Sequence, residues 1–197
     1  EQHIKRDRAT SNICTAQVLL AVMAGMYAVY HGPKGLKFIA SKINTQTKSL
    51  YNALNSLGLT IKNNSFFDTL HIEADVNNIK PLAEAEKINF YYPDNSSVVI
   101  AINETTNEDD LKSIITIFEK ATQKTADKKE PYFSSLPQHL ERQTTYMTSE
   151  IFNTYHSETE LMRYIKRLER KDLSLNHSMI SLGSCAMKLN AASDMLP

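Results

Sequence analysis

The N-terminal quarter of the chain follows two successive helical patterns. Residues 18–30 are thirteen positions without a polar residue. A run that is apolar on every face predicts a buried helix, and this one falls short of the roughly 18 residues that a membrane span needs. Pro33 and Gly58 then bracket a second, amphipathic helix, because proline favours the first helical turn and glycine the position just after the last one. The apolar stripe of this helix consists of Leu36, Ile39, Ala40, Ile43, Leu50, Ala53, Leu54 and Leu57.

Residues 66–122 predict a small unit with the element order β-α-β-β-α. Pro81 leads us to expect that the regular part of the first helix of this unit begins late. Asn107 and the three acidic residues after it are typical of a helix start, since they satisfy free amides and face the positive end of the helix dipole. The predicted elements are a strand over 66–72, a helix within 76–88, strands over 89–92 and 97–103, and a helix following Asn107.

A polar stretch separates this unit from the C-terminal part of the chain. Residues 123–137 contain two prolines and no periodicity, so we interpret them as a linker. Beyond it, Ser157 and Glu160 form the capping-box pattern S-x-x-E before a helix whose apolar stripe is Leu161, Met162, Ile165 and Leu168. The expected fold class is therefore α/β, with a mixed α+β subdomain over residues 1–122 and a second region over 123–197.

Composition excludes several classes of function. Lysine plus arginine and aspartate plus glutamate number 22 each, so no basic face for nucleic acid is indicated. The five glycines form no glycine-rich loop, which removes the dinucleotide fingerprint and the P-loop. Cys14 and Cys185 lie far apart, and no histidines or cysteines show metal-ligand spacing, so we expect no disulfide framework, no metal site and a reducing compartment.

Two clusters of candidate functional side chains remain. Ser184, Cys185 and Lys188 stand in an aperiodic C-terminal segment, where a hydroxyl, a thiol and an ammonium could converge on one ligand. The alternative is that Cys185 is a small buried hydrophobic residue. Lys5, Arg6 and Arg8 form a short basic cluster close to His3, which offers charge-assisted hydrogen bonds to a phosphate or carboxylate, or else is a solvated approach to a helix. The basic residues of the helix after Ser157 alternate with acidic ones, which a solvated helix face explains.

Longer stretches of sequence are more specific. They are EQHIKRDRATSNICTAQ (1–17), YHGPKGL (30–36), FFDTL (66–70), YHSETELMRYIKRLERKDLSLNHSMI (155–180) and LGSCAMKLN (182–190). Together, and in this order, they resemble the P-proteins of the glycine cleavage system, the family of pyridoxal-phosphate-dependent glycine dehydrogenases (decarboxylating). The resemblance covers essentially the whole chain, and it is most specific at the two ends.

The resemblance implies a piece from the middle of a longer chain, in agreement with a first residue that is Glu1 rather than Met. Each half of the family's chain has the fold of aspartate-aminotransferase-like (fold type I) enzymes, and residues 1–122 would end the first half while 123–197 begin the second. The implied activity is decarboxylation of glycine with pyridoxal 5'-phosphate. Carbon dioxide leaves, and the aminomethyl group passes to the lipoyl arm of a partner H-protein. The resemblance further implies a homodimer of the full chain in the bacterial cytoplasm, or in the mitochondrion of a eukaryote, without nucleic-acid or membrane partners.

By analogy of position, the resemblance also implies where the site residues lie. The cofactor-binding lysine is expected beyond Pro197, so Lys188 is not that lysine, and the isolated chain is expected to be inactive. The family usually has Pro at Ser181 and Thr at Ala186, which puts a hydroxyl role at position 186 in doubt. The rival interpretation is a non-catalytic docking module or an inactive paralogue. The residues expected to line the glycine and cofactor site are Ser184, Cys185, Lys188 and Asn190, followed by Thr10, Ser11, Asn12, His3 and Arg6.

Overall fold

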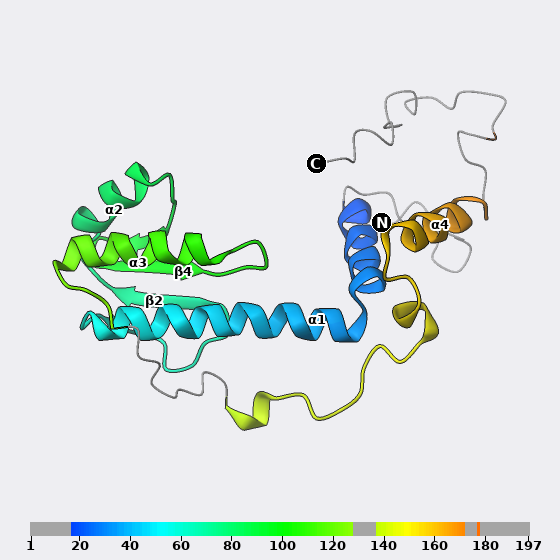
Figure 1. Ribbon diagram of the computed structural model, residues 1–197, viewed down its shortest axis with the longest axis horizontal. Helices are drawn as coiled ribbons and strands as arrows, with labels where there is room; N and C mark the ends of the chain where they lie inside the picture. Colours follow the sequence, from blue (N-terminus) through cyan, green and yellow to red (C-terminus); the bar gives the residue numbers. More distant parts are fainter. Residues whose placement is uncertain (1–16, 128–136, 172–176, 178–197) are drawn as a thin grey trace, which may run out of the picture. The chain divides into compact units, whose positions relative to one another are not determined.

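The computed structural model describes residues 17–127, 137–171 and 177. They divide into two compact units, one made of residues 33–127 and 137–146 and the other of residues 17–32, 147–171 and 177. The elements, coloured along the sequence in Figure 1, are α1 (Gln17–Ser56), β1 (Thr60–Ile61), β2 (Thr69–Glu73), α2 (Val76–Ala85), β3 (Tyr91–Asp94), β4 (Ser97–Ala101), α3 (Glu108–Thr122), η1 (Gln138–Leu140), η2 (Glu150–Asn153) and α4 (Glu158–Glu169).

Helix α1 consists of two helical segments that meet at Gly32. The backbone of Gly32 is not helical, with φ 59° and ψ −178°, and Pro33 starts the next segment. A positive φ is accessible to glycine without a steric penalty, and proline fits a first helical turn because its missing amide would have no partner there. The predicted change of helix at this point is confirmed, and it coincides with the boundary between the two units.

The larger unit is built on a four-stranded antiparallel sheet with the strand order β1-β2-β4-β3. Leu70 pairs with Ile100 and Ile72 with Val98, so these four side chains share one face of the sheet. The predicted strand over 66–72 is shifted, since β2 begins only at Thr69, and the two-residue strand β1 was not predicted. Pro93 lies in β3, an edge strand, where a residue without an amide is tolerated.

One hydrophobic core joins the sheet to three helices, in agreement with the predicted α/β subdomain. Alternate strand positions meet the apolar stripe of the second segment of α1 and the buried faces of α2 and α3, and α2 packs beside α3 (Figure 1). Burial of apolar side chains on one face of each element is the main stabilising term for such a unit. The buried core residues are Leu50, Leu54, Leu57, Phe66, Leu70, Ile72, Val76, Ile79, Ala83, Val98, Ile100, Ile102, Leu111, Ile114, Ile117 and Phe118.

Side-chain caps set where the helices of this unit begin. The carboxylate of Asp75 accepts the amide of Asn77, so α2 begins at Val76. The expectation that Pro81 delays the regular part of this helix was therefore wrong, because proline removes a single amide donor while the cap already orders the first turn. At α3 the predicted cap is confirmed: Asn107 and Asp110 form a reciprocal capping box.

Two expectations about burial in the smaller unit were also wrong. The start of α1 was predicted to be buried, yet Leu19, Leu20 and Met23 are more than half exposed, because no other described segment covers these turns. In α4, Ile165 of the predicted apolar stripe is 45% exposed, whereas Tyr164 is buried because another tyrosine ring packs on it.

The described helices include none that is long and apolar enough to cross a membrane.

Of the predicted linker, the structure describes Pro137 and the beginning, residues 123–127. There Lys124 donates to the carbonyl of Leu57 and the amide of Asp127 to the hydroxyl of Ser56, so residues 124–127 pack against the end of α1. Residues 128–136 lie outside the described ranges. The division of the chain at residue 122 stays a prediction.

Candidate functional site

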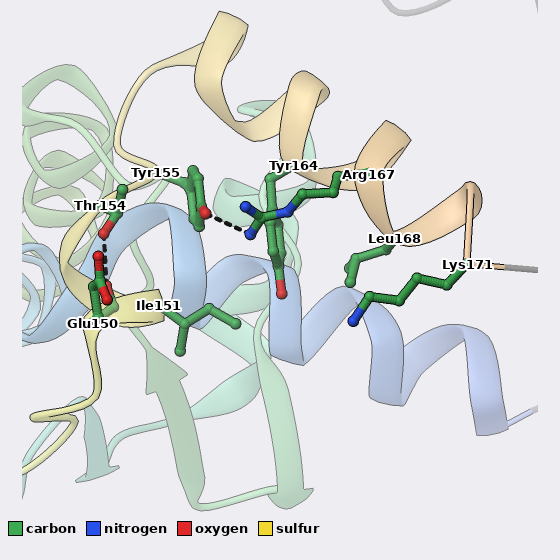
Figure 2. A pocket seen from close by; sticks show the side chains of 8 residues that line it. All are labelled: Glu150, Ile151, Thr154, Tyr155, Tyr164, Arg167, Leu168 and Lys171. Atoms are coloured by element: carbon green, nitrogen blue, oxygen red, sulfur yellow. Dashed lines mark hydrogen bonds between the residues drawn. The ribbon is translucent and has the colours of Figure 1, made fainter.

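The smaller unit holds a pocket of about 510 Å³ between the turn η2 and helix α4. The segment before α4 supplies one wall and successive turns of α4 supply the other, as Figure 2 shows. A concave surface that combines apolar side chains with a few charged groups is the usual form of a small-molecule site. The lining residues are Glu150, Ile151, Thr154, Tyr155, Tyr164, Arg167, Leu168 and Lys171.

Local hydrogen bonds hold the two walls. The side-chain amide of Asn153 donates to the carbonyls of Met147 and Ser149, and the hydroxyl of Thr154 donates to the carbonyl of Glu150. Helix α4 then begins at a cap, because the hydroxyl of Ser157 accepts the amide of Glu160. The predicted helix is thereby confirmed. The capping box differs in one respect: the carboxylate of Glu160 accepts a hydrogen bond from the hydroxyl of Ser157 rather than from the backbone amide of Ser157.

Two tyrosines and one arginine of the pocket lining contact one another. The rings of Tyr155 and Tyr164 stack with their centroids 4.4 Å apart. The guanidinium of Arg167 donates to the hydroxyl of Tyr155 at 2.6 Å and lies 5.5 and 5.2 Å from the two ring centroids. A hydrogen bond and two cation–π contacts therefore restrict the position of this guanidinium.

The basic residues of this unit differ in whether they form an ion pair with a carboxylate. Lys166 pairs with Glu169 at 2.7 Å, whereas neither Arg167 nor Lys171 forms an ion pair with a carboxylate of the described residues. Arg167 and Lys171 are one turn apart in sequence and both line the pocket, with Glu150 among the residues of the opposite wall. The pocket thus offers two cations to an incoming acidic group.

A second contact ties the segment before α4 to the end of the first segment of α1. The Nδ1 atom of His156 lies 2.7 Å from the carbonyl oxygen of Tyr30. A carbonyl only accepts hydrogen bonds, so Nδ1 carries the proton and donates. The carbonyls of the last turn of a helix have no partner within the helix, and His156 supplies one of the missing donors.

The larger unit has a hollow of about 810 Å³ between α1 and α3. Its lining is mostly apolar carbon and includes Phe38, Leu111 and Ile115, with the side chains of Lys42 and Lys112 at its edges. Lys42 donates to the carbonyl of Glu104, and Lys112 pairs with Asp109, which raises the pKa of this lysine through a hydrogen bond and charge attraction. No chemically reactive set of side chains converges there.

The candidate residues predicted from the sequence all lie outside the described ranges and stay predictions. They are His3, Arg6, Thr10, Ser11, Asn12, Ser184, Cys185, Lys188 and Asn190. Among the described residues, no group of histidine, cysteine, aspartate and glutamate side chains could hold a metal ion.

The pocket at Arg167 was missed at the level of sequence, where the basic residues of α4 were interpreted as a solvated face. The signal was the spacing of Tyr164, Arg167, Leu168 and Lys171, which places an aromatic ring, a guanidinium, an apolar side chain and an ammonium on one side of a helix. The ring of Tyr155 comes from outside that helix, so periodicity within α4 could not reveal the stacked pair.

Comparison with known proteins gives consistent matches. The family model of the glycine cleavage system P-protein matches residues 1–118. The glycine dehydrogenases (decarboxylating) of Christiangramia forsetii and Flavobacterium johnsoniae are each 60% identical over 199 residues, which cover 100% of this chain and 21% of each relative. That of Nostoc sp. is 51% identical over 215 residues, with the same coverage. A crystal structure of a P-protein of the glycine cleavage system in inhibitor-bound form superimposes with a TM-score of 0.48 and 23% identity, over 59% of this chain and 29% of that one.

Proposed function

Because the chain belongs to the glycine cleavage system P-protein family, we propose that it forms part of an enzyme that decarboxylates glycine. The enzyme would use pyridoxal 5'-phosphate, release carbon dioxide and pass the remaining aminomethyl group to the lipoyl arm of an H-protein. The observation that carries this proposal is the 60% identity to glycine dehydrogenases (decarboxylating) along the whole chain. A shared fold does not by itself imply a shared function, because function depends on the residues of a site. A sequence identity of 60% covers individual residues as well as the fold, and is therefore the stronger argument.

The proposal concerns a longer protein. The chain spans about a fifth of the length of the relatives that it matches (21%). For that longer protein we propose two halves of fold type I, a homodimer and a location in the bacterial cytoplasm, or in the mitochondrion if the source is a eukaryote. The family model and the relatives support membership of the family, and these proposals rest on that membership.

The N-termini of α2, α3 and α4 and the pocket at Arg167 do not fit the phosphate group of pyridoxal 5'-phosphate. A helix N-terminus is the usual phosphate site. Here Asp75 caps α2, and the first turns of α3 and α4 hold carboxylates that would repel a dianion; those carboxylates are Glu108, Asp109, Asp110, Glu158 and Glu160. The pocket at Arg167 also includes Glu150. The cofactor would therefore be held by other parts of the enzyme, and we propose that the 197-residue chain alone is inactive.

Within this chain, we propose that the segment with Ser184, Cys185, Lys188 and Asn190 lines the glycine site, and that His3, Arg6 and Thr10 to Asn12 approach it from the first half. The hydroxyl, thiol and ammonium groups of the first set could hold a carboxylate. In the full-length enzyme, Lys188→Met should raise the KM for glycine, whereas Lys34→Met is the control, because Lys34 lies in a described helix remote in sequence from these segments. Equal KM values for the two variants would contradict this assignment.

The test of the main proposal is a glycine–bicarbonate exchange assay on the full-length enzyme with lipoylated H-protein. We expect exchange that needs both the cofactor and the lipoyl group. If the full-length protein binds H-protein without exchange, the alternative of a docking module or inactive paralogue holds instead. For the isolated chain, titration with pyridoxal 5'-phosphate should give no saturable absorbance band that glycine alters, and such a band would contradict the proposed inactivity.

A further inference from the structure

We propose that the pocket between η2 and α4 binds a small monocarboxylate with an apolar carbon chain, and that Arg167 is the group that binds its carboxylate. The proposal stands apart from the glycine reaction, because it rests on the contacts of described residues in the smaller unit alone. The residues proposed above for the glycine site lie outside the described ranges, and no step of this proposal depends on them.

The guanidinium of Arg167 is positioned before any ligand arrives. It donates to the hydroxyl of Tyr155 at 2.6 Å, and the stacked rings of Tyr155 and Tyr164 lie beside it. Figure 2 shows the arginine side chain extending from α4 toward Tyr155. Because little side-chain freedom is left to lose, a ligand that pairs with this group has a smaller entropic cost.

Arg167 also retains donors for a ligand. A guanidinium has five N–H donors in a planar fork, and one of them is used by Tyr155. No carboxylate of the described residues forms an ion pair with Arg167 or with Lys171, which lies just after the end of α4. The geometry of the fork matches the two oxygens of a carboxylate, and the ammonium of Lys171 adds a second positive charge to the same wall.

The remaining lining selects the rest of the ligand. Ile151, Leu168 and the ring of Tyr164 offer apolar surface next to the cations. An aliphatic chain of several carbons would bury its surface there, whereas a fully hydrated anion would gain nothing from this contact. A volume of about 510 Å³ accommodates such a molecule.

The same surroundings disfavour a phosphate dianion. Glu150 belongs to the lining, and Arg167 and Lys171 lie at the end of α4 where the helix dipole is negative. Two cations can balance one carboxylate together with these negative contributions, but they balance a doubly charged group less well. The pocket is therefore expected to prefer a single negative charge.

The experiment is a titration of the 197-residue chain with hexanoate, followed by the ¹H–¹⁵N signals of the arginine Nε–H groups and by calorimetry. We expect saturable binding that shifts one arginine signal. Hexanamide has the same carbon chain without the charge and should bind at least tenfold more weakly, since charge-assisted hydrogen bonds contribute about that factor or more. Inorganic phosphate should not displace hexanoate at equal concentration.

Variants assign the effect to Arg167. Arg167→Gln should weaken hexanoate binding at least tenfold, and Arg167→Lys should also weaken it, because lysine keeps the charge but not the fork. Tyr155→Phe should weaken binding severalfold, since it keeps the ring and removes the hydroxyl that positions the guanidinium. The matched control is Arg170→Gln, which removes an exposed arginine at the C-cap of α4 that is not among the described lining residues of the pocket.

Several results would overturn the proposal. They are the absence of saturable hexanoate binding, equal affinity for hexanamide, displacement by phosphate, or equal losses in Arg167→Gln and Arg170→Gln. Circular dichroism shows whether each variant retains its helix content. If Arg167→Gln unfolds α4, the comparison of hexanoate with hexanamide and the arginine signal of the unmodified chain decide the question.

Discussion

The imidazole of His156 lies directly against the backbone of Gly32. A methyl group at Gly32 would lie 2.7 Å from Cε1 of His156 and 2.5 Å from the carbonyl oxygen of Phe152. The same histidine donates to the carbonyl of Tyr30, two residues before the glycine. Residues 30–32 and 155–156 both belong to stretches on which the resemblance to the P-proteins rests, and the structure shows that they pack against each other.

Gly32→Ala should therefore loosen the smaller unit. Alanine at φ 59° and ψ −178°, a backbone region that is essentially restricted to glycine, costs about 1 to 3 kcal/mol, and the clash with Phe152 and His156 adds to this cost. We expect faster amide hydrogen exchange in residues 17–31 and 150–156, measured by mass spectrometry. Gly25→Ala is the matched control, because nothing lies within 4 Å of a Cβ there, and alanine is the better helix former by roughly 0.5 to 1 kcal/mol. Equal exchange in the two variants would contradict the packing described for Gly32.

Asp94 should make the stability of the larger unit depend on pH in the acidic range. The hydroxyl and amide of Ser96 and the hydroxyl of Ser97 donate to Oδ1 of Asp94 and lower the pKa of this carboxyl from 3.8 to about 2. A carboxyl whose pKa is lower in the folded state contributes stability above its unfolded pKa, and this contribution is lost as the pH falls through the folded value. The change therefore takes place between about pH 4 and pH 2.

The variant Asp94→Asn keeps an oxygen acceptor in the turn but removes the charge. We expect it to be less stable than the unmodified chain at pH 6, with a difference that shrinks as the pH is lowered from 4 to 2, in urea titrations followed by circular dichroism. The comparison variant is Asp68→Asn, an exposed aspartate that accepts the hydroxyl of Thr69. A difference at Asp94 that stays constant over this pH range would show that the charge is not responsible.

The cap of α3 should contribute measurably to the larger unit. Oδ1 of Asn107 accepts the amides of Asp109 and Asp110 at 2.8 and 3.0 Å, and Asp110 accepts the amide of Asn107 in return. Asn107→Ala leaves these amides without the side-chain acceptor and should reduce the free energy of unfolding by about 1 kcal/mol, measured by thermal unfolding. Asn107→Ser should stay within a few tenths of a kcal/mol, since serine caps comparably. A serine variant as unstable as the alanine variant would indicate that another property of the asparagine side chain matters.

The sequence by itself determined most of the local structure of this protein and its family. Helix starts at Asn107 and Ser157 and the change of helix at Gly32 follow from side-chain chemistry and periodicity, which act over a few residues. Family membership followed from long specific stretches. The start of β2 was misplaced because Phe66 is buried without being part of the strand.

Only the tertiary structure decided which distant residues meet and which apolar faces are covered. The stacking of Tyr155 on Tyr164, the contact of His156 with Gly32 and the exposure of Leu19 depend on the packing of separate segments. Periodicity tells which side of a helix is apolar, but it does not tell what lies against that side. For that reason the pocket at Arg167 could be found only when the segment before α4 and the helix itself were seen together.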